Sequence, residues 1–317
     1  MRPRAAFCGN EAALRAVYAE AERRALEDLV ELGPLEEAEL VLSTWGMPRL
    51  DSAFLAAAPR LRCVFYGAGS VHYFVTEESW ARRVRVTSAW SANAVPVADY
   101  TLGLILVSLK SGWRQAAAMR GLAPSLARDD VAGTYGSTVG LVSMGAVGRL
   151  VRERLRPFDL HVLAHDPFLA PEEATRLKVE AVSLEDLLRR SDVVSLHTPL
   201  LPATRGLIGG DELRLMQEGA TLINTSRGAI VREPELIEVL RRRPDLQAVL
   251  DVTDPEPSAP DSPLRSLPNV VLTPHIAGSI GPERRRMGAM MVDEVRRQVR
   301  GLPLRGEVTP ELLARMA

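Results

Sequence analysis

Residues 138–158, TVGLVSMGAVGRLVRERLRPF, contain an apolar run, a glycine-containing turn and an amphipathic segment in that order. The run predicts a buried strand, and the segment after the turn predicts a helix. Gly145 and Gly148 stand at the second and third glycine positions of the dinucleotide pattern G-x-G-x-x-G, whereas Ser143 stands at the first. The second glycine lets backbone approach a pyrophosphate, and the third lets helix pack against strand. The turn therefore indicates a nucleotide site in which only the turn-forming glycine is replaced.

The residues after the turn support this interpretation. HVLAHD (residues 161–166) predicts the next strand, and it ends in Asp166, eighteen residues after Gly148. A carboxylate there accepts hydrogen bonds from an adenosine ribose and repels a 2′-phosphate, so the sequence favours NAD over NADP. On these residues alone, an ordinary strand–turn–helix with a surface aspartate stays open.

A serine nucleophile on the same turn is the competing interpretation. Ser143, Asp251 and His275 occur in the chain order of an α/β-hydrolase triad. The G-x-S-x-G elbow requires a small residue two positions before the serine, and Leu141 occupies that position. We therefore disfavour a nucleophile.

Apolar runs alternate with amphipathic segments along the whole chain. The later runs are apolar nearly throughout, which is typical of parallel strands covered by helices on both faces. One series precedes Asn93 and a second begins near residue 138. We predict an α/β fold with two doubly wound parallel-sheet units. Long helices after Asn93 and after Gly281 are the expected crossings, so the C-terminus would complete the first unit.

The composition excludes several classes of protein. The chain has 317 residues and a formal net charge of −1, whereas nucleic-acid binding needs a concentrated basic surface. Cys8 and Cys63 are the only cysteines, so we expect neither disulfides nor a metal site. The longest apolar run, residues 102–109, is far shorter than the roughly 20 residues that span a bilayer. The first residues lack the apolar core of a signal peptide. We expect a cytoplasmic protein that binds neither nucleic acid nor membrane.

Ionisable residues follow the last predicted strands. They are Arg227 in INTSRGAIV, Asp251 and Glu256 in LDVTDPEP, and His275 in LTPHIAG. Arginine binds a carboxylate at two points, histidine moves protons near neutral pH, and a neighbouring carboxylate fixes the histidine tautomer. The set predicts acid–base chemistry on a small 2-keto or 2-hydroxy acid. The histidines on or beside other strands are expected to be structural or to line the cofactor pocket: His161, His165 and His197.

Together these motifs resemble the D-isomer-specific 2-hydroxyacid dehydrogenase family. The similarity covers most of the chain and also includes YGAGSVHYF, NAVPVADYTLGLIL, LHTPLLPATRGLI and DSPLRSLPNVVLTPHIAG. The resemblance implies a discontinuous, flavodoxin-like substrate domain of residues 1–102 and 287–317. It also implies a Rossmann NAD-binding domain of residues 103–286, a cleft between the two, and a homodimer.

The resemblance assigns roles to individual residues. Arg227 would bind the substrate carboxylate and carbonyl, His275 would act as acid and base, and Glu256 would support His275. Backbone amides of Ala68 and Gly69 would hold the substrate carboxylate. The following residues would line the NAD site: Gly145, Ala146, Val147, Gly148, Asp166, Thr198, Thr225, Gly278 and Asp251, the last at the nicotinamide carboxamide.

The implied activity is reversible hydride transfer between NAD(H) and a small D-2-hydroxy acid or 2-keto acid. Ser143 departs from the family's glycine, a change that bears on cofactor affinity. The loop GAGSVHYF lacks an acidic residue often found there, so we expect an unusual substrate preference. Glu256 argues against formate oxidation. A phosphite-type dehydrogenase and an NAD-binding, corepressor-like module of the same fold stay open.

Overall fold

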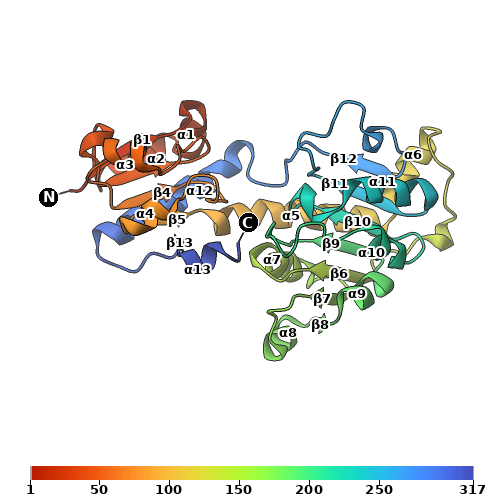
Figure 1. Cartoon of the computed structure of the whole chain (residues 1–317). Coiled ribbons are helices and arrows are strands. Elements are labelled where there is room, and N and C mark those ends of the chain that lie inside the picture. Colours follow the sequence, from red (N-terminus) through yellow and green to blue (C-terminus); the bar gives the residue numbers. More distant parts are fainter. Residues whose placement is uncertain (1, 317) are drawn as a thin grey trace. The chain divides into compact units, whose positions relative to one another are not determined.

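The computed structural model describes residues 2–316, which divide into two compact units (Figure 1). Unit 1 extends to Ala94 and resumes at Ser279, and unit 2 is Val95–Gly278. Both changes of unit lie eight residues before the expected boundaries after residues 102 and 286. The reason is local, because the backbone N–H of Ser279 donates to Asn93 Oδ1 at 2.9 Å and joins the two crossing segments within unit 1.

Unit 1 is built on a six-stranded sheet of order β13-β5-β4-β3-β1-β2. Its strands are parallel except β13, which is antiparallel to β5. The strands are β1 (Arg4–Cys8), β2 (Glu31–Leu32), β3 (Leu40–Ser43), β4 (Cys63–Tyr66), β5 (Arg85–Ser88) and β13 (Glu307–Val308). The helices are α1 (Glu11–Val17), α2 (Glu20–Glu27), α3 (Ser52–Ala57), α4 (Glu77–Ala81), α12 (Arg284–Val299) and α13 (Pro310–Leu313).

Unit 2 holds a seven-stranded, all-parallel sheet of order β12-β11-β10-β9-β6-β7-β8. The strands are β6 (Thr138–Val142), β7 (His161–His165), β8 (Glu180–Ala181), β9 (Val193–Leu196), β10 (Thr221–Asn224), β11 (Gln247–Leu250) and β12 (Val270–Leu272). The helices are α5 (Trp90–Leu109, which begins in unit 1), α6 (Gly112–Met119), α7 (Ala146–Leu155), α8 (Pro171–Leu177), α9 (Leu184–Arg190), α10 (Gly210–Leu215) and α11 (Glu233–Arg242). The predicted pair of doubly wound parallel sheets is confirmed.

The apolar strands of unit 2 serve two cores because successive side chains point to opposite faces. In β9, Val194 and Leu196 join the core under α9, α10 and α11, whereas Val193 joins the core shared with α5 and α7. In β10, Leu222 and Ile223 divide in the same way. Burial on both faces therefore explains why these strands read as continuous apolar runs.

Helix α5 is long and apolar enough, by length and composition, to cross a membrane. It contains Pro96, and 56% of its apolar window is buried. Its Tyr100 hydroxyl donates to Thr273 Oγ1 at 3.2 Å, and Thr101 Oγ1 lies 3.0 Å from Thr225 Oγ1. These contacts make α5 a core helix that supports loops at one edge of the unit 2 sheet. The apolar run of residues 102–109 is only its last part.

Candidate active site

The expected site residues of unit 2 follow the carboxyl ends of its strands. Because the strands are parallel, these ends meet at one edge of the sheet. The glycine turn follows β6 and Asp166 follows β7, while Arg227, Asp251 and His275 follow the adjacent strands β10, β11 and β12. Strand order reverses between β6 and β9. In doubly wound sheets, ligands bind beyond the carboxyl ends at such a point.

The turn after β6 contains the three positions of the dinucleotide pattern, Ser143, Gly145 and Gly148, and each has a different reason to favour glycine. Ser143 has φ = 77°, the left-handed conformation that glycine adopts most easily. A Cβ on Gly148 would lie 2.2 Å from the Ser143 carbonyl oxygen, so α7 can pack this closely only with glycine. A Cβ on Gly145 would meet no protein atom within 4 Å. Protein packing therefore does not demand glycine at 145, whereas close approach of a ligand does.

The neighbouring groups fit the pyrophosphate and ribose of a dinucleotide. Helix α7 begins at Ala146, and the N–H groups of its first turn, including Val147, have no intrahelical acceptor and suit an anion. Asp166 accepts the backbone N–H groups of Met144 at 2.7 Å and Phe168 at 2.8 Å. Its carboxylate is thereby held beside the turn, where ribose hydroxyls would be bound.

His275 and Glu256 are in direct contact. Imidazole Nδ1 lies 2.5 Å from Glu256 Oε1, and the two side chains are 46% and 41% exposed. His275 adopts φ = 54°, which is unusual for a residue with a Cβ. Hydrogen bonds at the backbone N–H of His275 and at its imidazole ring hold this conformation. A carboxylate on Nδ1 leaves Nε2 as the nitrogen available for proton transfer.

Asp251 holds the turn that carries His275. Its carboxylate accepts the Thr273 hydroxyl at 2.6 Å and the backbone N–H groups of Ile276 at 2.9 Å and Ala277 at 2.8 Å. Its backbone carbonyl accepts the N–H of His275 at 2.8 Å. Asp251 is only 1% exposed, which leaves little surface for the expected contact with the nicotinamide carboxamide.

The turn after β10 places Arg227 near Glu256. Burial lowers the pKa of Arg227, and the nearby charge of Glu256 partly opposes that shift. The Arg227 guanidinium donates to the Ser226 carbonyl at 2.7 Å. Asn224, which the sequence analysis missed, bonds Ser226 through its side-chain oxygen and the Arg227 carbonyl through its nitrogen. An asparagine at a strand end is a known turn signal and could have been recognised.

Gly228 is a second residue that sequence analysis missed. A Cβ there would lie 2.0 Å from the Thr253 carbonyl oxygen. Only glycine therefore lets the Arg227 turn lie against the loop that carries Glu256. The sequence signal is the glycine directly after Arg227.

The remaining expected site residues of unit 2 are mostly buried or bonded to the protein itself. Thr198 is buried and donates to the Val142 carbonyl at 3.4 Å, while buried Thr225 bonds Thr101. Gly278 is the last residue of unit 2. His197 is buried, neither ring nitrogen has a hydrogen-bond partner among residues 2–316, and burial lowers its pKa to about 4. Within residues 2–316, no three His, Cys, Asp or Glu side chains are placed to share a metal ion.

In unit 1, Ala68 and Gly69 follow β4. Their carbonyls accept the hydroxyl of Ser88. Their backbone N–H groups have no acceptor within the described residues 2–316. Two adjacent N–H groups without an acceptor suit an anionic ligand, which agrees with the expected carboxylate contact.

Comparison with known proteins places the chain in a family. Residues 103–277 match the model described as "D-isomer specific 2-hydroxyacid dehydrogenase, NAD binding domain". The chain belongs to the D-isomer-specific 2-hydroxyacid dehydrogenase family. Unit 2 corresponds to the family's NAD-binding domain, and NAD is the cofactor.

Several named members of the 2-hydroxyacid dehydrogenase family are similar to this chain. The D-3-phosphoglycerate dehydrogenase of Mycobacterium leprae is 36% identical over 88% of this chain and 52% of its own length. The chain thus spans about half the length of such relatives. The (S)-sulfolactate dehydrogenase of Chromohalobacter salexigens is 38% identical over 78% of this chain and 81% of its own length. The D-mandelate dehydrogenase structure from Rhodotorula graminis covers 98% of both chains with a TM-score of 0.82 and 22% identity, which shows the fold alone.

Proposed function

We propose that this protein is an NAD-dependent D-2-hydroxyacid dehydrogenase that interconverts a small 2-keto acid and the corresponding D-2-hydroxy acid. The observation that supports this most is the 2.5 Å contact between His275 Nδ1 and Glu256 Oε1. That pair lies on the strand edge that also carries Arg227 and the dinucleotide turn. Acid–base chemistry beside a hydride carrier is what reduction of a keto group requires.

In the proposed mechanism each side chain has one task. The glycine turn from Gly145 to Gly148 and Asp166 would hold NADH, which when bound would supply the hydride that reduces the keto group. Arg227 binds the substrate carboxylate through its planar guanidinium and polarises the keto oxygen. The imidazolium of His275 donates its Nε2 proton to that oxygen as it gains negative charge, so the carbonyl becomes a hydroxyl. Glu256 keeps Nδ1 protonated and orients the ring. In the reverse direction, neutral His275 accepts the hydroxyl proton.

The substrate would have its carboxylate bound by the backbone N–H groups of Ala68 and Gly69 as well. The names of the relatives indicate acids of different size, since they include D-3-phosphoglycerate, (S)-sulfolactate and glyoxylate enzymes. Asp166 favours NAD because its carboxylate would repel a 2′-phosphate. We therefore propose NAD and a small 2-keto acid as the reacting pair.

A panel assay tests this proposal. Purified protein is mixed with NADH and a series of 2-keto acids, and a parallel sample receives NAD⁺ and phosphite. We expect NADH consumption with at least one keto acid and no NADH formation from phosphite. A flat panel together with clear NADH binding would favour a regulatory, NAD-binding module. NADH formation from phosphite would favour the phosphite-type alternative.

We also propose that the enzyme works as a cytoplasmic homodimer. Three large apolar side chains of one segment of unit 2 are exposed, namely Met119 at 87%, Leu122 at 53% and Tyr135 at 83%. Such side chains are typical of a surface that a partner covers. Light scattering after size-exclusion chromatography should give a mass twice that of the 34.6 kDa chain. A monomer at micromolar concentration would contradict the proposal.

A further inference from the structure

Trp45 and Arg284 form an isolated cation–π pair in unit 1. The Arg284 guanidinium carbon lies 5.6 Å from the centroid of the Trp45 ring, and Trp45 is 38% exposed. No carboxylate among residues 2–316 pairs with Arg284, and its buried Nε has no acceptor. The neighbouring Glu283 accepts the backbone N–H of Ile280 at 3.0 Å instead. Arg284 therefore keeps terminal donors that the fold does not use.

The backbone holds Trp45 in place. Gly46 has φ = 87°, and a Cβ there would lie 3.0 Å from the backbone nitrogen of Asn10. The N–H of Asn10 donates to the Trp45 carbonyl at 3.3 Å. These contacts fix the turn after β3, so the Trp45 ring offers a stable face on which the guanidinium stacks. A pre-positioned guanidinium loses less conformational freedom when it binds an anion.

The pair lies beside the loop that we propose binds the substrate carboxylate. Trp45 follows β3 by two residues, and Ala68 and Gly69 follow the adjacent strand β4. The two strand ends are joined, because the Gly67 N–H donates to the Ser43 carbonyl at 2.7 Å and the Thr44 hydroxyl donates to the Gly67 carbonyl at 3.0 Å. Unpaired N–H groups and an unpaired guanidinium therefore lie at neighbouring strand ends of one sheet.

We propose that Trp45 and Arg284 form a second anion subsite, which selects 2-keto acids that carry another carboxylate, sulfonate or phosphate at the far end. Ala68 and Gly69 take the carboxylate next to the keto group, and Arg284 takes the second anionic group through its planar fork. Trp45 covers one face of the guanidinium and restricts its motion. This inference rests on the proposed function for its substrate, but not for the anion contact itself.

Steady-state kinetics of Arg284→Gln test the subsite. Wild-type kcat/KM should be about tenfold or more higher for a keto acid with a second anionic group, such as ketosuccinate or sulfopyruvate, than for pyruvate. Arg284→Gln should lower kcat/KM for the dianionic acids by about tenfold or more, mainly through KM, because a charge-assisted contact is lost. Its effect on pyruvate should stay within about twofold. The matched control is Arg285→Gln, which removes a neighbouring exposed arginine that does not stack on Trp45. Equal losses for all acids, or no wild-type preference, would overturn the proposal.

A binding experiment separates this inference from the proposed reaction. Calorimetry on the NAD-saturated protein compares sulfoacetate with acetate. We expect sulfoacetate to bind about tenfold more tightly, a difference that Arg284→Gln abolishes and Trp45→Ala reduces. If no keto acid is reduced but this contrast is present, the proposed reaction fails and the anion subsite stands. If turnover is normal but wild-type protein binds both anions equally, the subsite is wrong.

Discussion

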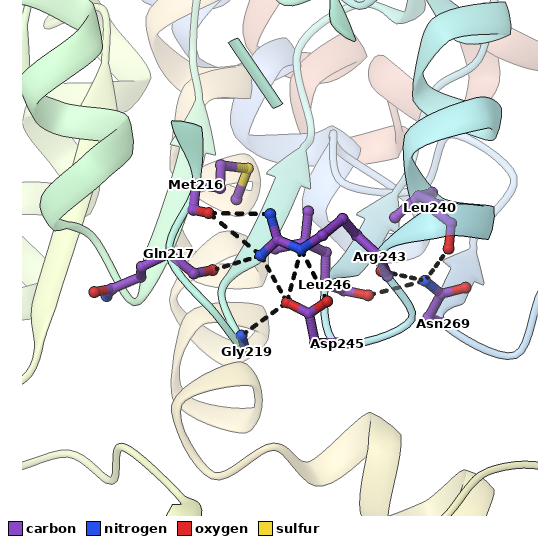
Figure 2. A network of polar contacts seen from close by, with 8 residues as sticks. All are labelled: Met216, Gln217, Gly219, Leu240, Arg243, Asp245, Leu246 and Asn269. Atoms are coloured by element: carbon purple, nitrogen blue, oxygen red, sulfur yellow. Dashed lines mark hydrogen bonds and ion pairs between the residues drawn. The ribbon is translucent and has the colours of Figure 1, made fainter. Parts of the chain in front are cut away.

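Polar groups at the amino edge and at the carboxyl edge of the unit 2 sheet differ in their hydrogen bonding. At the amino edge, Figure 2 shows Arg243 between Asp245, at 2.7 Å, and the carbonyls of Met216 and Gln217, at 3.4 Å. Asn269 donates to the carbonyls of Leu240 and Leu246, both at 3.0 Å. Of the eight residues in this network, only Gly219 has a left-handed φ, and it is a glycine.

At the carboxyl edge, several turns that follow strands of this sheet contain strained or unsatisfied groups. Ser143 and His275 adopt positive φ despite their Cβ atoms. In the part of the chain that the structure describes, nothing bonds the buried ring nitrogens of His197, and burial lowers the pKa of Arg227. Strain and unsatisfied polar groups cost stability, and they persist where ligands use them. The network around Arg243 therefore stabilises the amino ends of β10, β11 and β12, whereas the turns at the carboxyl edge are arranged for binding and chemistry. Four predictions test this contrast.

The largest effect is expected from His275→Asn. Asparagine tolerates the left-handed backbone, so folding is retained while the proton donor is lost. We expect kcat to fall by about a thousandfold, because general acid–base catalysis contributes roughly 10²–10⁴. NAD affinity, followed by fluorescence titration, should be unchanged. His161→Gln is the control, because His161 is exposed and lies at the amino end of β7, at the opposite edge of the sheet from His275. Normal turnover in His275→Asn would remove the catalytic assignment.

His197 should make folding sensitive to acid. Burial lowers the pKa of His197 to about 4 from 6.5, so the folded state favours the neutral ring. The unfolded chain binds more protons between these values, and stability is therefore lost as pH falls from 6.5 towards 4, by up to roughly 3 kcal/mol. The unfolding free energy of wild type should fall relative to that of His197→Gln as the pH is lowered from 7 to 4. Parallel curves would show that His197 is not buried in its neutral form.

A matched pair of buried asparagines separates the two edges directly. Asn269→Ala removes donors to buried carbonyls at the amino edge and should lower the unfolding free energy by about 2 kcal/mol, with kcat/KM unchanged. Asn224→Ala should lower stability by a similar amount and also reduce kcat/KM, because Asn224 holds the Arg227 turn. Chemical denaturation and steady-state assays measure both. Equal changes in kcat/KM for Asn269→Ala and Asn224→Ala would contradict the proposed difference between the two edges.

The smallest effect is expected from Ser143→Gly. Glycine relieves a left-handed conformation at φ = 77°, so stability should rise by about 1 kcal/mol or less, and NAD affinity should improve or stay the same. Lys178→Gly is the control, because Lys178 has φ = 53° at the end of α8, away from the turn. It should stabilise without changing NAD affinity. Markedly weaker NAD binding by Ser143→Gly would contradict our view of the turn.

Much of the fold could be predicted because local patterns dominate it. Continuous apolar runs predicted strands buried on both faces, and the spacing from Gly145 to Asp166 predicted the strand–turn–helix–strand unit. The helix α5 was predicted to begin after Asn93, but it begins at Trp90 and is shared between the two units. The sequence analysis missed Asn224 and Gly228, because the sequence shows neither that Asn224 bonds the Arg227 turn nor that Gly228 packs against Thr253. The catalytic roles of Arg227, Glu256 and His275 stay predictions until they are assayed.

Local sequence patterns specify the two parallel sheets, the glycine turn and the order of charged residues after the last strands. These features depend on side-chain periodicity and on residues near one another in the chain. Three contacts are evident only in the folded protein: Asp251 accepts hydrogen bonds from the His275 turn, the Thr253 carbonyl requires glycine at 228, and Arg284 stacks on Trp45. Such contacts join segments that the chain separates by tens or hundreds of residues, so no local pattern carries them.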